Sequence, residues 1–205
     1  MQRLTLHEYA ASGNCYKIRL TAAHLGLSLE RVTYDIMRGE TRTSDYLERI
    51  NANGRIPVLQ IDQRFLPESN AACVWLAYGS DLIPADRFDH ADMLRWMFWE
   101  QYSHEPNVAT LRFWRAFVGE VALTEAQHAQ IPGKEAAGHA ALALMDEHLS
   151  DRDWFAGGAF SLADVVLYPY THAAPSGGFD LSRYPAVTRW LKRVASRPGH
   201  MGMDE

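Results

Sequence analysis

A proline at the start of an apolar strand pattern restricts the fold of this chain more than any other feature. Residues 53–59 read NGRIPVL, a turn that leads directly into strand-forming residues, and Pro57 lies where that strand begins. Proline has no backbone N–H and is disfavoured inside a central strand. A cis bond after Ile56 turns the chain sharply and leaves the backbone N–H and C=O of Ile56 facing outward, able to pair with another extended backbone. The alternative is an ordinary trans proline, the commoner form of an X-Pro bond.

The first 80 residues alternate between strand and helix patterns. Their apolar periodicity predicts four strands and three helices. We expect strands at residues 4–9, 29–34, 56–59 and 64–66, and helices after residue 14, over 43–50 and through 78. Asn14 is the expected cap of the first helix, and Gly26 is expected to end it. The resulting order, β-α-β-α-β-β-α, has one parallel crossover and one hairpin.

The second part of the chain is predicted to be helical. Tryptophan, methionine and phenylalanine side chains between residues 85 and 115 fit one long helix that is kinked near Pro106. The sequence SLAD at residues 161–164 resembles a capping box in which Asp164 replaces the usual Glu or Gln. Residues 187–194 form a last amphipathic helix.

Composition divides the chain near residues 82–86, a proline-bearing stretch that is typical of a linker. The first 80 residues carry nine basic and eight acidic side chains, whereas the rest carry 11 and 17, together with five of the six tryptophans. We therefore predict two domains, residues 1–80 and residues 85–205. The net charge of the chain is −5 and no basic run occurs, which disfavours nucleic acid as a partner.

Composition also excludes several classes of protein and site. No apolar run in the 205 residues approaches the length of a membrane span, and the start lacks a signal-peptide core. We therefore expect a cytoplasmic protein with no membrane partner. Two cysteines, Cys15 and Cys73, are too few for a disulfide scaffold or a four-thiolate zinc site. Because His104 has no partners at ligand spacing, no metal site is predicted.

Five short sequences occur in an order that resembles the cytosolic glutathione transferases. They are SGNCYK at residues 12–17, NGRIPVL at 53–59, ESNA at 68–71, FSLAD at 160–164 and the pair Tyr184-Pro185. The chain looks most like bacterial members near the theta and zeta classes. The resemblance implies an α+β thioredoxin-like N-terminal domain, an all-α helical bundle domain, a substrate pocket between them and a homodimer. It also favours the cis form of Pro57.

A glutathione thiol must be held as a thiolate to act as a nucleophile at neutral pH. Lowering its pKa of about 8.5 by two units requires roughly 2.7 kcal/mol of preferential thiolate stabilisation. A helix start near Asn14 favours an anion beside it, and a hydroxyl on the same loop can donate to the sulfur. Ser12 suits that role and matches the catalytic serine of theta- and zeta-like enzymes. The alternative is that Ser12 is only a turn residue.

Cys15 is the other candidate for the sulfur chemistry. In beta-like bacterial transferases a cysteine near this helix start contacts glutathione and can form a mixed disulfide. A thiol at a helix start is expected to have a lowered pKa. No second cysteine follows at Cys-x-x-Cys spacing, so only a monothiol mechanism is open to Cys15. We favour a buried structural role for Cys15, and we expect Cys73 to lie in the core.

The resemblance also implies residues that bind the tripeptide. The backbone of Ile56, beside Pro57, would pair with the cysteinyl unit of glutathione. A carboxylate at Glu68 suits the γ-glutamyl ammonium, and the Ser69 hydroxyl at a helix start suits its carboxylate. The glycyl carboxylate needs a cation. The sequence offers Arg38, Arg42 and Arg55, of which we choose Arg42, and Asn14 completes the set.

An electrophile pocket is less well specified by the sequence. Tyr102 and Glu105 lie three residues apart, so a helix places them on one face, and Arg112 follows further along. We predict a transferase that joins the glutathione thiolate to a hydrophobic electrophile, with glutathione as co-substrate and no permanently bound cofactor. Two alternatives stay open. One is a glutathione-dependent thiol-disulfide oxidoreductase or peroxidase, and the other is a non-catalytic glutathione- or ligand-binding protein.

Overall fold

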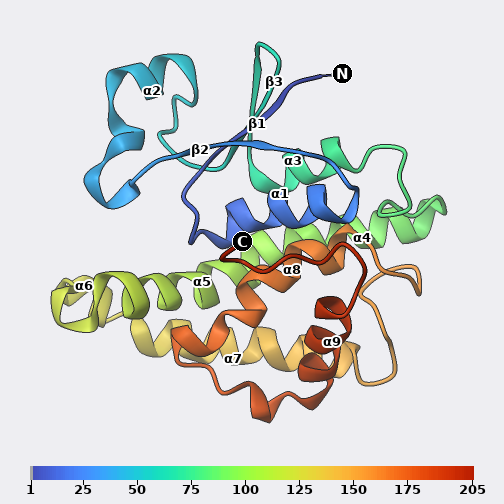
Figure 1. The fold of residues 1–205 in the computed structure, drawn as a ribbon. Coiled ribbons are helices and arrows are strands. Elements are labelled where there is room, and N and C mark those ends of the chain that lie inside the picture. The colour runs from blue at the N-terminus through green and yellow to red at the C-terminus, as the bar shows by residue number, and fades with distance from the viewer. Residues whose placement is uncertain (1) are drawn as a thin grey trace. The chain divides into compact units, whose positions relative to one another are not determined.

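The computed structural model describes residues 2–205, which form two compact units (Figure 1). The first unit runs through Ile83 and also contains Pro198–Glu205. The second unit is Pro84–Arg197. The chain therefore divides within the proline-bearing stretch that the sequence identifies. The last eight residues differ from expectation, because the sequence assigns them to the helical part and the structure joins them to the first unit.

A four-stranded mixed sheet is the centre of the first unit. Its strands are β1 (Leu4–Glu8), β2 (Glu30–Thr33), β3 (Val58–Ile61) and β4 (Arg64–Pro67), in the order β2-β1-β3-β4. β1 pairs with β2 in parallel, while the β1–β3 and β3–β4 pairs are antiparallel. The helices are α1 (Gly13–His24), α2 (Ser44–Arg49) and α3 (Ser69–Leu76). This confirms the predicted order of elements, with one parallel crossover and one hairpin.

Strand register decides which side chains enter the core of the first unit. Leu6 pairs with Leu59, and both are fully buried on the same face of the sheet. Figure 1 shows α1 and α3 side by side next to the strands, and Cys73 of α3 is also fully buried, as predicted. The opposite face carries His7, whose ring nitrogens bond to the Tyr34 hydroxyl at 2.9 Å and to Gln60 Oε1 at 3.0 Å. The apolar positions of β1 and β3 thus fix the sheet against α1 and α3.

The chain returns to the first unit across the end of α1. Gly199 adopts φ +78, and a Cβ there would lie 3.0 Å from the Ala23 carbonyl oxygen, so this crossing depends on glycine. Beyond it, the Tyr16 hydroxyl donates to the Met201 carbonyl at 2.5 Å, and Arg31 donates to the Glu205 carbonyl at 2.8 Å. Hydrophobic periodicity does not reveal such hydrogen bonds to distant backbone carbonyls. The sequence therefore assigns residues 198–205 to the predicted helical domain, 85–205.

The second unit is built mainly from helices. They are α4 (Arg87–Trp99), α5 (Glu105–Phe113), α6 (Glu125–His128), α7 (Ile131–His148), α8 (Leu162–His172) and α9 (Pro185–Ala195). Residues 87–118 are helical throughout, in agreement with the long helix predicted over 85–115, but the helix does not keep α geometry along its whole length. A five-residue π-helical turn, Glu100–His104, separates α4 from α5. Pro106 cannot donate a helical hydrogen bond and its ring crowds the preceding turn, so the helix widens just before it.

Asp164 anchors the start of α8, as the capping-box pattern predicts. Its carboxylate accepts the Ser161 N–H at 3.0 Å, the Phe155 N–H at 3.2 Å and the Trp190 indole N–H at 2.9 Å. One buried side chain therefore holds together the helix start, the preceding loop and α9. Burial raises the pKa of Asp164 to about 6. Among the helices described, none is both long enough and apolar enough to cross a bilayer.

Candidate active site

Ser12 is the N-cap of α1, the helix that follows the first strand. Its Oγ accepts the Cys15 N–H at 3.4 Å, and its carbonyl accepts the Tyr16 N–H at 3.0 Å. The prediction that Asn14 caps this helix is therefore wrong, because an Asn14 cap would start the helix at Cys15 and the helix begins two residues earlier, at Gly13. The correction brings the Ser12 hydroxyl to the positive end of a 12-residue helix.

Cys15 is fully buried in the first turn of α1. Burial raises the pKa of its thiol to about 12, so the lowered pKa expected for a thiol at a helix start is wrong. The sulfur instead accepts the Tyr9 N–H at 3.5 Å, across the loop between β1 and α1. The predicted structural role of Cys15 thus agrees with its burial and its bond to the loop.

The start of α3 meets the start of α1. The Ser69 hydroxyl donates to Asn14 Oδ1 at 3.2 Å, which joins two residues that the sequence assigns to one site. Glu68 precedes Ser69 as the N-cap of α3 and has the backbone angle φ +73, in the left-handed region that non-glycine residues rarely adopt. Strained backbone of this kind is common at functional sites. Glu68 is exposed, whereas Ser69 is buried.

The peptide bond between Ile56 and Pro57 is cis, as predicted. Pro57 is buried and leads into β3, while Ile56 is half-buried. Within residues 2–205, neither the N–H nor the C=O of Ile56 has a hydrogen-bond partner. This backbone pair can therefore accept another extended segment.

Arg42 lies beside the turn that precedes Ile56. Its Nη1 donates to the Asn53 carbonyl at 3.1 Å, and the guanidinium rests on the backbone of Gly54. A Cβ at Gly54 would lie 2.5 Å from Nη1, so only glycine leaves room for this arginine. Arg38 instead forms an ion pair with Asp35 at 3.4 Å. Arg42 is thus seated on the turn that leads to the Ile56 edge, and the third candidate cation, Arg55, is an exposed residue that directly precedes Ile56.

The residues predicted for an electrophile pocket lie in the π-helical turn Glu100–His104 and in α5. Tyr102 is 87% exposed within that turn. Glu105 begins α5 and accepts a hydrogen bond from Gln101. The Arg112 guanidinium lies 4.9 Å from the centre of the Phe117 ring. The structure gives these three side chains different surroundings, and a common face for them stays a prediction.

Family models match most of this chain. The model described as the N-terminal domain of glutathione S-transferase matches residues 3–78, and the model of the C-terminal domain matches residues 107–198. The chain belongs to the glutathione S-transferase family. Its thioredoxin-like first unit and helical second unit are the fold of that family, and family members bind glutathione as a substrate or ligand.

Solved structures and curated relatives agree with the family. A possible glutathione S-transferase from Rhodopseudomonas palustris is 42% identical, with a TM-score of 0.93 over 98% of this chain and 90% of its own. A glutathione S-transferase from Pseudomonas fluorescens is 41% identical, with a TM-score of 0.91 over 98% and 99%. Among curated proteins, the Escherichia coli disulfide-bond oxidoreductase YfcG is 24% identical over 93% of this chain and 89% of its own.

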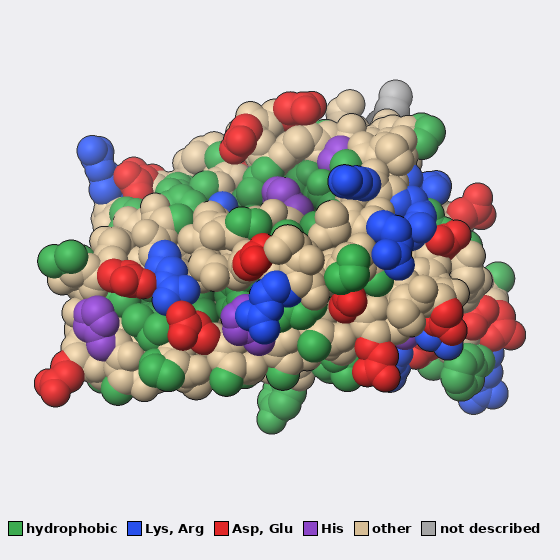
Figure 2. All heavy atoms as spheres, turned by 90° about the horizontal axis from the view of Figure 1, so that it is seen from below, with side chains coloured by type: hydrophobic (Ala, Val, Ile, Leu, Met, Phe, Trp, Pro, Cys, Tyr) green, Lys and Arg blue, Asp and Glu red, His purple; other side chains and the backbone are tan. Residues whose placement is uncertain are grey.

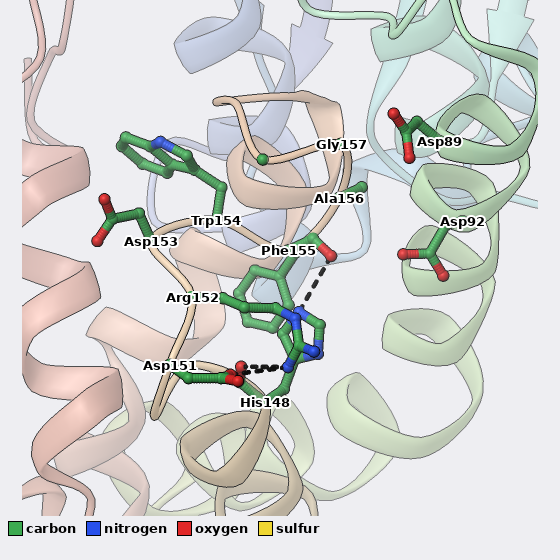
Figure 3. Close-up of a pocket in the computed structure, with 11 residues that line it drawn as sticks. Asp89, Asp92, His148, Asp151, Arg152, Asp153, Trp154, Phe155, Ala156 and Gly157 are labelled. Atoms are coloured by element: carbon green, nitrogen blue, oxygen red, sulfur yellow. Dashed lines mark hydrogen bonds and ion pairs between the residues drawn. The ribbon is translucent and has the colours of Figure 1, made fainter.

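The helical unit of this chain contains a cavity of about 530 Å³ that the sequence did not predict (Figure 3). Asp89 and Asp92 face it from α4, and His148 lies on the other side at the end of α7. Burial lowers the pKa of His148, and the nearby Arg152 adds to this effect. The lining residues include none of those predicted to bind glutathione or an electrophile. The only sequence signal is the polar run DRDW at residues 151–154.

Two further sequence predictions concern histidine and metals. His104 is fully buried, and its Nε2 lies 3.1 Å from the Thr171 hydroxyl, so it is a hydrogen-bonded core group. In the described part of the chain, no three His, Cys, Asp or Glu side chains are grouped so as to hold a metal ion. Figure 2 shows acidic and basic side chains interspersed on one face of the molecule.

Proposed function

We propose that this member of the glutathione S-transferase family joins the thiolate of glutathione to a hydrophobic electrophile. The observation that carries the proposal is the position of Ser12, whose hydroxyl caps the positive end of α1. A hydroxyl and a helix N-terminus at one place stabilise an anion that lies beside both. The chemistry therefore comes from the first unit, and the sulfur is the reacting atom.

The Ser12 hydroxyl and the start of α1 can together supply the free energy needed to hold glutathione as a thiolate. Lowering the thiol pKa by about two units requires roughly 2.7 kcal/mol. A hydrogen bond to a charged acceptor contributes about 1.5–3 kcal/mol. A helix N-terminus adds about 0.3–1 kcal/mol, and up to about 2 kcal/mol where the site is partly buried. The hydroxyl of Ser12 supplies the larger share, so removing it should raise the thiol pKa most of the way to its free value.

The reaction balances without a redox partner. The thiol proton passes to solvent as the sulfur becomes anionic. The sulfur lone pair then forms a carbon–sulfur bond at the electrophilic carbon. For an aryl halide, the carbon–halogen bond breaks and the halide leaves with its electron pair. The enzyme contributes the thiolate and its orientation toward the carbon.

The first unit offers a complementary group for each part of the tripeptide. The open backbone pair at Ile56, beside Pro57, suits the cysteinyl unit. Glu68 suits the γ-glutamyl ammonium, and Ser69 with the start of α3 suits the adjacent carboxylate. Arg42, seated on the turn before Ile56, suits the glycyl carboxylate, and Asn14 supports Ser69.

A homodimer is also part of the proposal. Phe88 and Phe98 of α4 are 76% and 72% exposed, respectively, and both are large apolar side chains on one helix. Exposed apolar side chains of this size favour burial against a partner, and a second copy of this chain is the partner that the family resemblance implies. Analytical ultracentrifugation of the native protein and of Phe98→Glu checks this, since the variant should shift toward monomer.

Three finer assignments stay predictions: the theta- or zeta-like class, the pocket residues Tyr102, Glu105 and Arg112, and the cytoplasmic location. Ser12 supports the class assignment, because it occupies the position of the catalytic serine there. Subcellular fractionation tests the location. Replacement of Tyr102 with alanine tests the pocket, because a pocket residue alters the KM for the electrophile more than that for glutathione.

A thiol-disulfide oxidoreductase is the second candidate function. The name of the relative YfcG, a disulfide-bond oxidoreductase, favours it. In this chain Cys15 is buried and its pKa is raised to about 12, so the reacting thiolate would be that of bound glutathione. Glutathione would then attack a disulfide sulfur, forming one S–S bond and releasing a thiolate. A non-catalytic glutathione-binding protein is a third candidate.

Ultraviolet titration of bound glutathione tests the central proposal. The thiolate absorbance of the wild-type complex should appear about two pH units below that of free glutathione. In Ser12→Ala it should appear at least about one unit higher than in wild type, with a smaller change in glutathione affinity. Ser44→Ala, an exposed serine at the start of α2, is the control and should match wild type.

Other outcomes separate the candidates. If the wild-type complex titrates like free glutathione, the transferase proposal is wrong. Normal turnover of an aryl halide by Ser12→Ala contradicts the role of Ser12. Turnover of mixed disulfides without conjugation of any electrophile supports the oxidoreductase. Tight glutathione binding with neither activity supports the binding protein.

A further inference from the structure

A cluster of three charged side chains, two of them buried, lies next to the loop that carries Ser12. Glu8, the last residue of β1, is fully buried. Its two carboxylate oxygens face two arginines, with Oε2 at 3.3 Å from Arg19 Nε and Oε1 at 2.5 Å from Arg31 Nε. The Arg19 side chain is only 2% exposed, whereas that of Arg31 is 36% exposed. The proposed thiolate chemistry uses none of these groups directly.

Stability alone does not account for such a cluster. Burying a carboxylate and a guanidinium costs several kcal/mol of solvation, and replacing a buried ion pair with apolar residues is often neutral or stabilising. Burial also lowers the pKa of Arg19, the expected effect of removing a cation from water. The buried Arg19 is therefore expected to have a role other than stabilising the fold.

Arg19 reaches the loop between β1 and α1 with a second guanidinium nitrogen. Its Nη2 donates to the Ala10 carbonyl at 2.7 Å, two residues before Ser12. The same loop is held by the bond from the Tyr9 N–H to Cys15 Sγ and by the bond from the Ser12 N–H to the Tyr9 carbonyl at 2.9 Å. These contacts fix the backbone on the path into Ser12. Of these three hydrogen bonds, only the one from Arg19 to the Ala10 carbonyl has a charged donor. Hydrogen bonds with a charged partner are stronger than those between neutral groups.

We propose that Arg19, oriented by Glu8, is a positioning residue that fixes the β1–α1 loop so that the Ser12 hydroxyl points at the glutathione sulfur. This inference rests on the proposed function of Ser12. Arg19 makes no hydrogen bond to Ser12, so it acts through the Ala10 carbonyl. If the Ser12 hydroxyl already points at the sulfur before the thiolate forms, the loop does not have to rearrange when the negative charge develops.

The geometry requires an arginine rather than any cation. A planar guanidinium offers nitrogens on separate corners, so Arg19 faces Glu8 with Nε and Ala10 with Nη2 at the same time. A lysine has one ammonium and no such fork. Arg19→Lys therefore keeps the charge beside Glu8 and removes the fixed link to the loop.

Arg31 provides a matched control on the other oxygen of the same carboxylate. It lies on β2, and its Nη1 donates to the Glu205 carbonyl at 2.8 Å, away from Ser12. Arg31→Lys makes the same chemical change to the Glu8 cluster without touching a loop contact. A general effect of the cluster charge would appear in both variants, and a positioning effect would appear only in Arg19→Lys.

The experiment compares wild type, Arg19→Lys, Arg31→Lys and Ser12→Ala. For each we would measure glutathione affinity by calorimetry, the thiol pKa of bound glutathione by ultraviolet titration, and the pH profile of aryl halide conjugation. In Arg19→Lys we expect the thiol pKa to rise by about one unit and kcat at neutral pH to fall about tenfold. The KM for glutathione should change by less than about threefold, and Arg31→Lys should match wild type.

The outcomes distinguish this inference from the proposed function. If wild type lowers the thiol pKa and Arg19→Lys does so equally, the inference is overturned and the function of Ser12 stands. Equal losses in both lysine variants also overturn it. If wild type itself does not lower the thiol pKa, the proposed function fails and the inference fails with it.

Wild-type hydrogen–deuterium exchange decides the matter if Arg19→Lys does not fold. A fixed loop predicts slow exchange of the Ser12 amide before glutathione is added, and little further slowing after it. Fast exchange of that amide in the unliganded protein overturns the inference. Glu8→Gln is a second variant, because it keeps the shape of the side chain, removes the charge that orients Arg19, and should raise the thiol pKa in the same way.

Discussion

At the scale of single residues, burial separates the chemistry of Ser12 from that of Cys15. Both lie at the start of α1, where the helix favours a negative charge. Cys15 is fully buried, and the loss of hydration disfavours its thiolate more than the helix start favours it. Ser12 is only half-buried, so its hydroxyl can meet a sulfur brought by a ligand.

Cys15 should be inert in the folded protein. With a pKa of about 12, only about one molecule in 10⁵ carries the thiolate at pH 7. We expect iodoacetamide to leave Cys15 unmodified in native protein at neutral pH and to alkylate it fully once the chain is unfolded. Mass spectrometry of the peptide that contains Cys15 checks this. A mixed disulfide between Cys15 and glutathione in the folded protein contradicts it and supports the oxidoreductase.

At the scale of elements, one carboxylate joins α8 to α9. Asp164 caps α8 through the Ser161 N–H and accepts the indole N–H of Trp190 on α9. These donors prefer an ionised carboxylate, but complete burial opposes the charge, and burial dominates because the pKa is raised. Packing of two helices in the second unit is therefore linked to the protonation of one group.

The stability of the second unit should depend on the protonation of Asp164. Its pKa is about 6 in the fold against an ordinary 3.8, so the folded chain binds a proton that the unfolded chain has released between these values. The stabilising contribution is full below about pH 4 and is lost as the pH rises through 6. The difference of about two units corresponds to about 3 kcal/mol.

Asp164→Asn isolates this effect, because asparagine does not titrate. The free energy of unfolding in urea, measured from pH 4 to pH 7.5, should favour wild type over the variant by up to about 3 kcal/mol more at pH 4 than at pH 7.5. Titration of the other carboxylates cancels in the comparison. A difference between the two proteins that stays constant with pH contradicts the prediction.

At the scale of the whole molecule, two separate segments of the chain form the first unit. Residues through Ile83 form the sheet and its helices. Pro198–Glu205, which follow the helical unit in the sequence, belong to the first unit as well. Met201 and Glu205 supply carbonyls to Tyr16 and Arg31. The thioredoxin-like unit therefore includes a segment far away in the sequence.

Removing residues 201–205 should weaken the first unit selectively. The deletion leaves the buried Tyr16 hydroxyl and one face of Arg31 without the acceptors that Met201 and Glu205 provide, at a cost of about 1–3 kcal/mol. Hydrogen–deuterium exchange should become faster in α1 and β2 and stay unchanged in α7. Tyr16→Phe, which removes one of the two contacts, should give a smaller change. Equal protection of α1 in the full and shortened chains contradicts this.

Much of the first unit was predictable because its elements follow local rules. Partial alternation marks β1, helical spacing marks α1, and an apolar run after the turn before Pro57 marks β3. The helix cap was misplaced by two residues, since Ser12 and Asn14 are both good caps and only the backbone distinguishes them. The choice of Ser12 as the candidate catalytic residue came from the family resemblance and did not depend on that error.

Features that depend on distant contacts were not predictable. Whether Cys15 has a high or low pKa depends on its burial beneath other elements, which spacing does not show. The π-helical turn before Pro106 was missed, because a proline signals a break in the helix without specifying its geometry. The link from Arg19 to Ala10 likewise depends on how α1 lies beside the strand end.

The unsatisfied amide and carbonyl of Ile56 have a consequence for selectivity. Main-chain hydrogen bonds do not depend on side-chain identity, so the Ile56 backbone by itself could bind many extended peptides. On the proposed assignment of the site, discrimination would come from the two termini of the tripeptide, through Glu68 at one end and Arg42 at the other. Analogues that keep the central thiol but lose either terminal charge should reveal how the recognition is shared.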